Sequence, residues 1–327
     1  MPSNIRLQAV SAATWFIGLV ASLLLILCAA PAAGLRVSFD PIPTTKALSL
    51  LGVFALLAWK ARTIMPRVAL VASSFVVIWG GALAGGALCM IAAMFRFPLI
   101  DPWLAAADTW LGINTVDVVR LVVAIPFAPK LLYSIYFLSV VLLFGTAFAL
   151  ACLGRAERLW EFCAAYGFCL LVATLCSLPL PATGAFEYLR LDAVYGSRLP
   201  PGSGVYWLEA LHAVRSSSSM VINPLGLHGL VAFPSFHTGM ALMTAAAWRD
   251  DRFLRWPMFV WNGLVLVSTM PIGGHYIVDV MAGALTWFVI FRYGAGWTGA
   301  MLSLRSRLTK VPAAAPSPEA AHVRSVG

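Results

Sequence analysis

The sequence predicts an all-α integral membrane protein, a polytopic bundle of about eight transmembrane helices. Hydrophobic residues make up 61% of the 327-residue chain and charged residues only 11%, whereas about a quarter of the residues in a soluble domain are charged. Apolar runs long enough to cross a bilayer recur along the chain, and most of the 22 Lys and Arg residues fall between these runs. This pattern excludes an ordinary soluble domain.

The first three apolar runs occupy 12–30, 47–59 and 68–95. The first run is long for the hydrophobic region of a cleaved signal peptide, so we expect it to be retained as a span. The third run contains Gly80-Gly81 and Gly85-Gly86, a spacing of small residues that allows helices to approach closely. A homodimer would use such a surface, but we favour packing within one chain.

The middle of the chain alternates between polar segments and spans. In 96–130, Trp103 and Trp110 lie among charged residues, which favours one or two helices at the membrane interface. The fourth and fifth spans follow, ending near residues 153 and 178. The longest polar stretch, 179–230, then leads into the last three spans. Long loops often carry function, so this stretch is a candidate lid or substrate-recognition element.

Two histidines stand at the starts of two of the last three spans, within the segment 229–283. His237 follows Pro234 and Ser235, and His275 follows two glycines. The chain between the histidines is long enough for one membrane crossing, a tight turn and a return. We therefore expect both histidines on the same side of the membrane.

The residues around these histidines fit chemistry on a phosphate group. His275 and Asp279 are four residues apart and share a helix face. The carboxylate can fix the imidazole tautomer and leave the other ring nitrogen free to attack. Helix N-termini offer free backbone N–H groups and the positive end of the helix dipole, so two converging starts favour an anion. Ser235 and Gly274, at these starts, are the predicted phosphate-binding residues.

Each motif also has a plainer interpretation. His237 alone could be a hydrogen-bonded interfacial histidine, and His275 with Asp279 could be a structural helix pair. Two imidazoles and a carboxylate could also hold zinc, although the positive ends of two helices oppose a cation. Ionisable groups at membrane depth are costly unless they are paired or hydrogen-bonded, so a His or Asp there indicates function by default. The two motifs together favour catalysis, and we expect no metal and no other cofactor.

The motifs resemble those of a known enzyme family. Pro234-Ser235-Phe236-His237 paired with His275-Tyr-Ile-Val-Asp279 is similar to the second and third signature motifs of the type 2 phosphatidic acid phosphatase superfamily. Ser268-Thr269-Met270 and Phe233 make the match more specifically similar to the inositol phosphorylceramide synthase branch. The resemblance implies a six-helix-like phosphatase core. It also implies that His275 is the nucleophile, that Asp279 orients it and that His237 protonates the leaving alcohol.

The sequence departs from the superfamily pattern at its positively charged positions. The phosphatases usually carry arginine six residues before the nucleophile, where this chain has Thr269. Their first motif has a lysine followed seven residues later by Arg-Pro, but here Lys130 is followed at that distance by Phe137 and Leu138. Lys130 is our first candidate for the cation that holds the phosphate, and Arg190 is the second.

The distribution of basic residues predicts domain organisation and orientation. We expect residues 1–304 to form a single membrane domain and residues 305–327 to form a disordered cytoplasmic tail. With a cytoplasmic N-terminus, most basic residues fall on the inside, as the positive-inside rule requires. This orientation places both histidines on the outer face, and we expect a bacterial inner membrane with a periplasmic site.

Several functions compete at this stage. The preferred one is a lipid phosphatase or a head-group phosphotransferase acting on a lipid phosphate or phosphodiester. The alternative is a proton-coupled transporter that uses the His and Asp residues as a relay, but the halves of the chain show no convincing repeat. The net charge of +9 does not indicate nucleic acid, because no basic cluster is interleaved with aromatic residues. The six cysteines lie in apolar runs and fit small buried side chains.

Overall fold

Helices dominate the computed structural model, which describes residues 3–227 and 229–308. Across these residues it contains thirteen α-helices and one pair of short strands, and 74% of the model is helical. The all-α prediction is confirmed. Most of the expected cytoplasmic tail, from residue 309 onward, lies outside the described residues.

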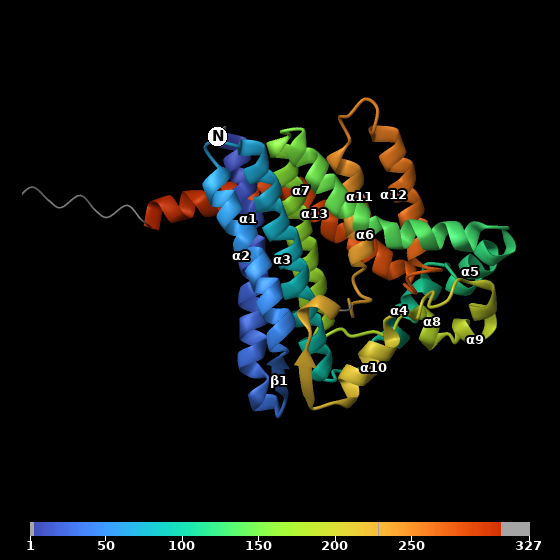
Figure 1. The fold of residues 1–327 in the computed structure, drawn as a ribbon. Helices are drawn as coiled ribbons and strands as arrows, with labels where there is room; N and C mark the ends of the chain where they lie inside the picture. Colours follow the sequence, from blue (N-terminus) through green and yellow to red (C-terminus); the bar gives the residue numbers. More distant parts are fainter. Residues whose placement is uncertain (1–2, 228, 309–327) are drawn as a thin grey trace, which may run out of the picture.

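Six helices of the described chain are long and apolar enough to cross a membrane. They are α1 (Ser3–Ala29), α2 (Pro41–Ala61), α3 (Pro66–Met94), α6 (Ala128–Cys152), α7 (Ala156–Ser177) and α13 (Ile277–Leu308). The sixth and seventh predicted spans correspond to α11 (Phe236–Ala247) and α12 (Arg255–Thr269), which have 12 and 15 residues. At 1.5 Å per residue these two helices reach only about 18 and 22 Å, less than the hydrocarbon core of about 30 Å. They form a short helical hairpin beside the long helices (Figure 1).

The main core surrounds α7, which packs against α1, α3, α11 and α13. The paired glycines of α3 make part of this packing possible. A methyl group added at Gly81 would lie 3.0 Å from the ring of Tyr166, and one added at Gly85 would lie 3.0 Å from Leu170. Both partners belong to α7, so the small residues of the third span serve contacts within the chain.

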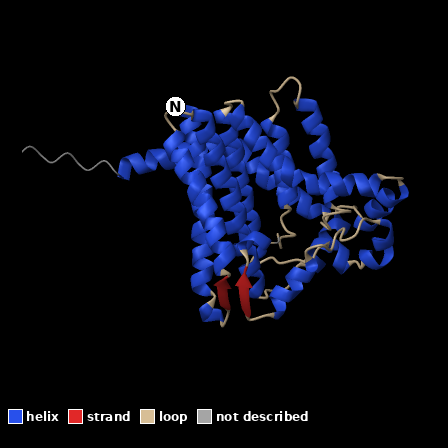
Figure 2. Ribbon diagram, viewed as in Figure 1, coloured by secondary structure: helices blue, strands red, loops and turns tan. Residues whose placement is uncertain are grey.

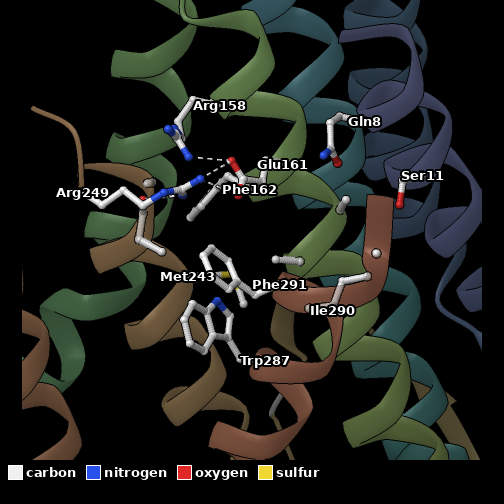
Figure 3. Close-up of a pocket in the computed structure, with 15 residues that line it drawn as sticks. Gln8, Ser11, Arg158, Glu161, Phe162, Met243, Arg249, Trp287, Ile290 and Phe291 are labelled. Atoms are coloured by element: carbon white, nitrogen blue, oxygen red, sulfur yellow. Dashed lines mark hydrogen bonds and ion pairs between the residues drawn. The ribbon is translucent and has the colours of Figure 1, made fainter. Parts of the chain in front are cut away.

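Ion pairs between charged side chains link the turn between α11 and α12 to the start of α7. Glu161 accepts hydrogen bonds from Arg158 at 2.7 Å and from Arg249 at 2.9 Å. Figure 3 shows this cluster in the lining of a pocket to which Trp287 and Phe291 of α13 also belong. The cluster lies at the end of the bundle that carries the chain's N-terminus (Figure 1).

The opposite end carries the shorter elements (Figure 1). They are α4 (Asp101–Trp110), α5 (Thr115–Ala124), α8 (Ala185–Tyr188), α9 (Leu191–Tyr195) and α10 (Leu208–Ser216). Strands β1 (Arg36–Phe39) and β2 (Ser219–Ile222) pair in parallel here (Figure 2), which the helical pattern of the sequence did not predict. Helices α4 and α5 form the segment expected to hold one or two interfacial helices.

The polar stretch 179–230 folds back onto the turn that precedes α13. The Gly204 N–H donates to the Ile272 carbonyl at 2.6 Å, and the Ala185 N–H donates to the Gly274 carbonyl at 2.8 Å. Gly204 and Gly274 both adopt positive φ, at 75° and 78°, and a methyl group on either would strike a neighbour. A Cβ at Gly274 would strike the Gly204 carbonyl oxygen and a Cβ at Gly204 would strike the Phe186 ring, so glycine is needed at both positions. The predicted loop is therefore part of the wall around His275.

Candidate active site

The starts of α11 and α13 meet directly, which brings the two histidine motifs together. The Ser235 N–H, at the N-cap of α11, donates to the Asp279 carbonyl in the first turn of α13 at 3.0 Å. A methyl group added at Gly283 would collide with the Ser235 carbonyl oxygen, so the two backbones are in contact. His237 and His275 consequently lie at the same end of the bundle.

His275 sits between a carboxylate and a hydroxyl. Its Nδ1 lies 3.3 Å from Asp279 Oδ2, and its Nε2 lies 3.4 Å from Ser235 Oγ. His275 is 4% exposed and Asp279 is fully buried. Asp279 Oδ2 also accepts from the Tyr276 N–H at 2.9 Å, which holds the carboxylate in place. This arrangement fixes Nδ1 and directs Nε2 toward the start of α11.

His237 is half-buried and rests on Tyr136 of α6. Its Nδ1 lies 3.1 Å from the Tyr136 hydroxyl, and the two rings stack with centroids 4.2 Å apart and planes at 20°. A methyl group added at Gly273 would lie 2.9 Å from both the Tyr136 hydroxyl and His275 Cδ2. The Tyr136 hydroxyl and the His275 ring therefore both lie against Gly273, which brings the hydrogen-bond partner of His237 close to His275.

The two helix starts differ in the backbone groups that they offer to an anion. At α13, the N–H groups of Ile277 and Val278 donate to Asp108 at 3.0 Å each. The expectation that both starts present free amides is therefore wrong for α13. At α11, the N–H groups of Phe236 and His237 have no hydrogen-bond partner within the described residues.

The predicted phosphate-binding residues are placed differently from one another. Ser235 lies beside His275 Nε2, as described above. The Gly274 N–H already donates to the Met270 carbonyl at 3.2 Å. Lys130 and Arg190 are exposed, and neither forms a hydrogen bond or ion pair with His237 or His275 anywhere in the described chain. Lys130 instead lines an outer pocket together with Arg198.

Two buried aspartates of α4 support the site and were not assigned a role from the sequence. Asp101 accepts from the N–H groups of Thr183 and Gly184 at 2.9 and 2.8 Å, and from the Tyr276 hydroxyl at 3.2 Å. Asp108 caps α13, as described above. The two aspartates are seven residues apart, so they share a helix face. Two aspartates at this spacing, within a helix expected at the membrane interface, are the sequence signal that could have indicated their supporting role.

The ionisation of these groups reflects their burial. Desolvation raises the pKa of the Asp108 carboxyl above its ordinary value, and the hydrogen bonds from Ile277, Val278 and Thr115 act in the opposite direction. Desolvation and the neighbouring Asp101 raise the pKa of the Tyr276 hydroxyl well above its ordinary range. Tyr276 therefore stays protonated and donates to Asp101.

Replacing Asp108 by alanine is expected to lower both stability and activity. The change leaves two partly buried N–H groups of α13 without their acceptor, and loss of a helix cap typically costs about 0.5–2 kcal/mol. We expect a lower midpoint of thermal unfolding in detergent and at least a roughly tenfold loss of turnover, since a small displacement of a catalytic residue is costly. Asp117→Ala is the matched control, because Asp117 is exposed on α5 and forms an ion pair with Arg120 at the surface. Equal effects of the two changes would contradict the capping role.

The described residues contain no group of three His, Cys, Asp or Glu side chains arranged to hold a metal ion. The fold and the site together define a polytopic helical membrane protein with a His–His–Asp cluster at one end of its bundle. The chain belongs to the PAP2 superfamily, whose family model matches residues 102–293, more than half of its length. That range contains every candidate catalytic residue named above. It begins within α4 and leaves out the first three long helices.

Other comparisons are more limited. An uncharacterized protein of Methanocaldococcus jannaschii is 33% identical over 60 residues, which cover 18% of this chain and 25% of that protein. The match thus spans about a quarter of that relative's length. No solved structure matches the chain. Membership of the superfamily suggests a phosphatase or phosphotransferase and gives no support to the transporter alternative.

Proposed function

We propose that the protein is a metal-independent lipid phosphatase or lipid head-group phosphotransferase that works through a phosphohistidine intermediate. The observation that carries the proposal is the setting of His275, whose Nδ1 faces Asp279 while Nε2 faces the start of α11. One nitrogen is thereby held by a carboxylate, and the other is available as a nucleophile. The superfamily supports the general activity, and this geometry supports the particular mechanism.

In the first step, Nε2 of neutral His275 attacks phosphorus in line with the departing alcohol. The phosphorus–nitrogen bond forms as the phosphorus–oxygen bond to the alcohol breaks. Asp279 stabilises the positive charge that develops on the imidazole ring, and His237 donates a proton to the leaving oxygen. The non-bridging oxygens are held by the Ser235 hydroxyl and by the free N–H groups of α11.

In the second step, His237 acts as a base. It removes a proton from water or from an acceptor alcohol, whose oxygen attacks the phosphohistidine and releases His275. Water gives a phosphatase, and an alcohol gives a head-group transferase. We favour hydrolysis, although Ser268-Thr269-Met270 resembles the inositol phosphorylceramide synthase branch. Ser268 and Thr269 are buried and their hydroxyls bond to carbonyls of their own helix, so they give no preference between the acceptors.

The remaining parts of the proposal concern the setting of the site. A substrate with a lipid tail fits a site at the end of apolar helices, and the distribution of basic residues favours an outer, periplasmic location in a bacterial inner membrane. Lys130 and Arg190 remain the first and second candidates for the cation that binds the phosphate, and Gly274 remains a candidate for phosphate binding. We also infer that residues 1–304 act as one domain.

The test is an assay of the purified protein in detergent. A panel of lipid phosphates and phosphodiesters is supplied with and without alcohol acceptors, and free phosphate is measured against transferred head group. Release of phosphate without an acceptor supports the phosphatase. Transfer that depends on the acceptor supports the transferase, and absence of both reactions across the panel contradicts the proposal.

Chelation of divalent metals is expected to leave the activity intact. The proposed nucleophile and acid are both imidazoles, so no step needs a metal ion. Turnover of the best substrate in EDTA should remain within about twofold of its value with Mg²⁺. A metal-dependent phosphatase assayed in parallel is the control for chelation. Complete loss of activity in EDTA, restored by added metal, would reject the scheme.

A further inference from the structure

The Tyr136 hydroxyl is a buried polar group to which the proposed mechanism gives no part. Tyr136 is 1% exposed and lies on the long, mostly apolar helix α6. Its hydroxyl is within hydrogen-bond distance of two groups, His237 Nδ1 at 3.1 Å and the Tyr206 hydroxyl at 3.3 Å. A phenylalanine would fill the same space at lower cost, because a buried hydroxyl must be hydrogen-bonded to be tolerated. The hydroxyl itself therefore needs an explanation.

Tyr206 reaches Tyr136 from the polar stretch 179–230. Gly204, two residues earlier, is bonded to Ile272 and packs against the Phe186 ring, where a methyl group would collide. Phe137 packs edge-on against Tyr206 with ring centroids 5.3 Å apart. The backbone contact between Gly204 and Ile272, which forms part of the wall around His275, thus also positions the Tyr206 hydroxyl.

The hydrogen bonds in this chain of groups can run in either direction, and one direction suits an acid–base catalyst. Tyr136 has one hydroxyl hydrogen and can donate it to Tyr206 while its oxygen accepts from the Nδ1–H of His237. In this arrangement Nδ1 keeps its hydrogen, and Nε2 alone gains and loses a proton. An acid that later becomes a base needs this property, because both transfers must use the nitrogen that faces the substrate.

The two histidines also differ in the kind of group that orients them. His275 is oriented by a carboxylate, which stabilises a positive ring, as a nucleophile carrying a phosphoryl group requires. His237 is oriented by a neutral hydroxyl, which fixes the tautomer without stabilising the imidazolium to the same extent. A protonated His237 therefore gives up its proton more readily. The difference matches the separate roles of nucleophile and acid.

We propose that Tyr136 is the positioning residue of His237 and that Tyr206 completes the pair by holding the Tyr136 hydroxyl. Together they keep the hydrogen on Nδ1 of His237 and leave Nε2 to protonate the leaving alcohol and then to deprotonate the acceptor. This inference rests on the proposed function. It adds that part of the acid–base apparatus belongs to the segment 179–230, which also carries α10 and the paired strand β2.

The test compares two substrates in the Tyr136→Phe variant. One is a long-chain alkyl phosphate, whose alkoxide must be protonated to leave. The other is a phosphate monoester of a nitrophenol that carries a similar alkyl chain, and this leaving group departs without protonation. We expect hydrolysis of the alkyl phosphate to fall about 10- to 100-fold, within the contribution usual for acid–base catalysis. The pre-steady-state burst of nitrophenol should change by less than about threefold.

Matched variants separate positioning from general damage. Tyr206→Phe should show the same selective pattern with a smaller loss, and it serves as the second test if Tyr136→Phe does not fold. Tyr133→Phe is the control, because Tyr133 lies on the same helix and its hydroxyl makes no hydrogen bond within the described chain. It should match the wild type with both substrates.

The outcomes distinguish this inference from the proposed function. If the wild type forms no phosphoenzyme, the proposed function fails. If the wild type forms one but Tyr136→Phe and Tyr206→Phe lose activity equally toward both substrates, or toward neither, the positioning role is overturned. Selective loss with the alkyl phosphate, together with normal trapping of the phosphoenzyme from the nitrophenyl substrate, supports the role.

Discussion

Replacing His275 by alanine is expected to abolish phosphoenzyme formation and to lower turnover by about three orders of magnitude or more. The buried imidazole is the proposed nucleophile, and the other hydrogen-bond donor to Asp279 among the described residues is the Tyr276 N–H, which cannot act as a nucleophile. The measurement uses a substrate labelled in its phosphoryl group, with rapid quenching in base, because a phosphohistidine survives base and is lost in acid. Turnover of the unlabelled substrate is measured on the same preparation.

His212→Ala is the matched control for this experiment. His212 is exposed on α10, pairs with Glu187 at 3.0 Å and has no predicted catalytic role. It should retain labelled phosphoenzyme and turnover close to those of the wild type. Labelled phosphoenzyme trapped in the His275→Ala variant would refute the assignment of His275 as the nucleophile.

Replacing Gly283 by alanine is expected to disrupt the site without changing any polar group. The added methyl group would collide with the Ser235 carbonyl oxygen and lie 3.0 Å from Thr238 Cβ. Because the obstacle is backbone, α11 and α13 must move apart, and overpacking of this kind typically costs about 1–3 kcal/mol. The movement shifts Ser235 and His237 relative to His275. A misplacement of about 1 Å can cost about 100-fold in rate, so we expect a loss of about this size.

Gly263→Ala tests whether the effect comes from this contact. Gly263 lies within α12, and a methyl group there meets nothing within 4 Å. Alanine in an open helical position is favoured over glycine by about 0.5–1 kcal/mol, so this variant should be at least as stable as the wild type and equally active. Both are followed by turnover and by thermal unfolding in detergent. A Gly283→Ala variant with normal activity would show that the close approach of the two helices is not required.

The number of membrane-spanning helices shows which spans composition can predict and which it cannot. Apolar runs predicted the six long helices well, because a span must hide about 20 residues of backbone in helical form. The same reasoning predicted spans for α11 and α12, which are shorter than a bilayer. Helix α11 packs against α6, α7 and α13, and α12 packs against α11 and α6. An apolar run cannot tell contact with lipid from contact with protein.

The candidate site likewise has features that the sequence predicts and features that only helix packing decides. The sequence alone grouped His237, His275 and Asp279, because helical rise and the four-residue spacing are local properties that a pattern can carry. It could not predict that Asp108 takes the free amides of α13 or that Tyr136 holds His237. These partners are separated by 169 and 101 residues in the chain. Their contacts depend on how whole helices pack, which no local spacing records.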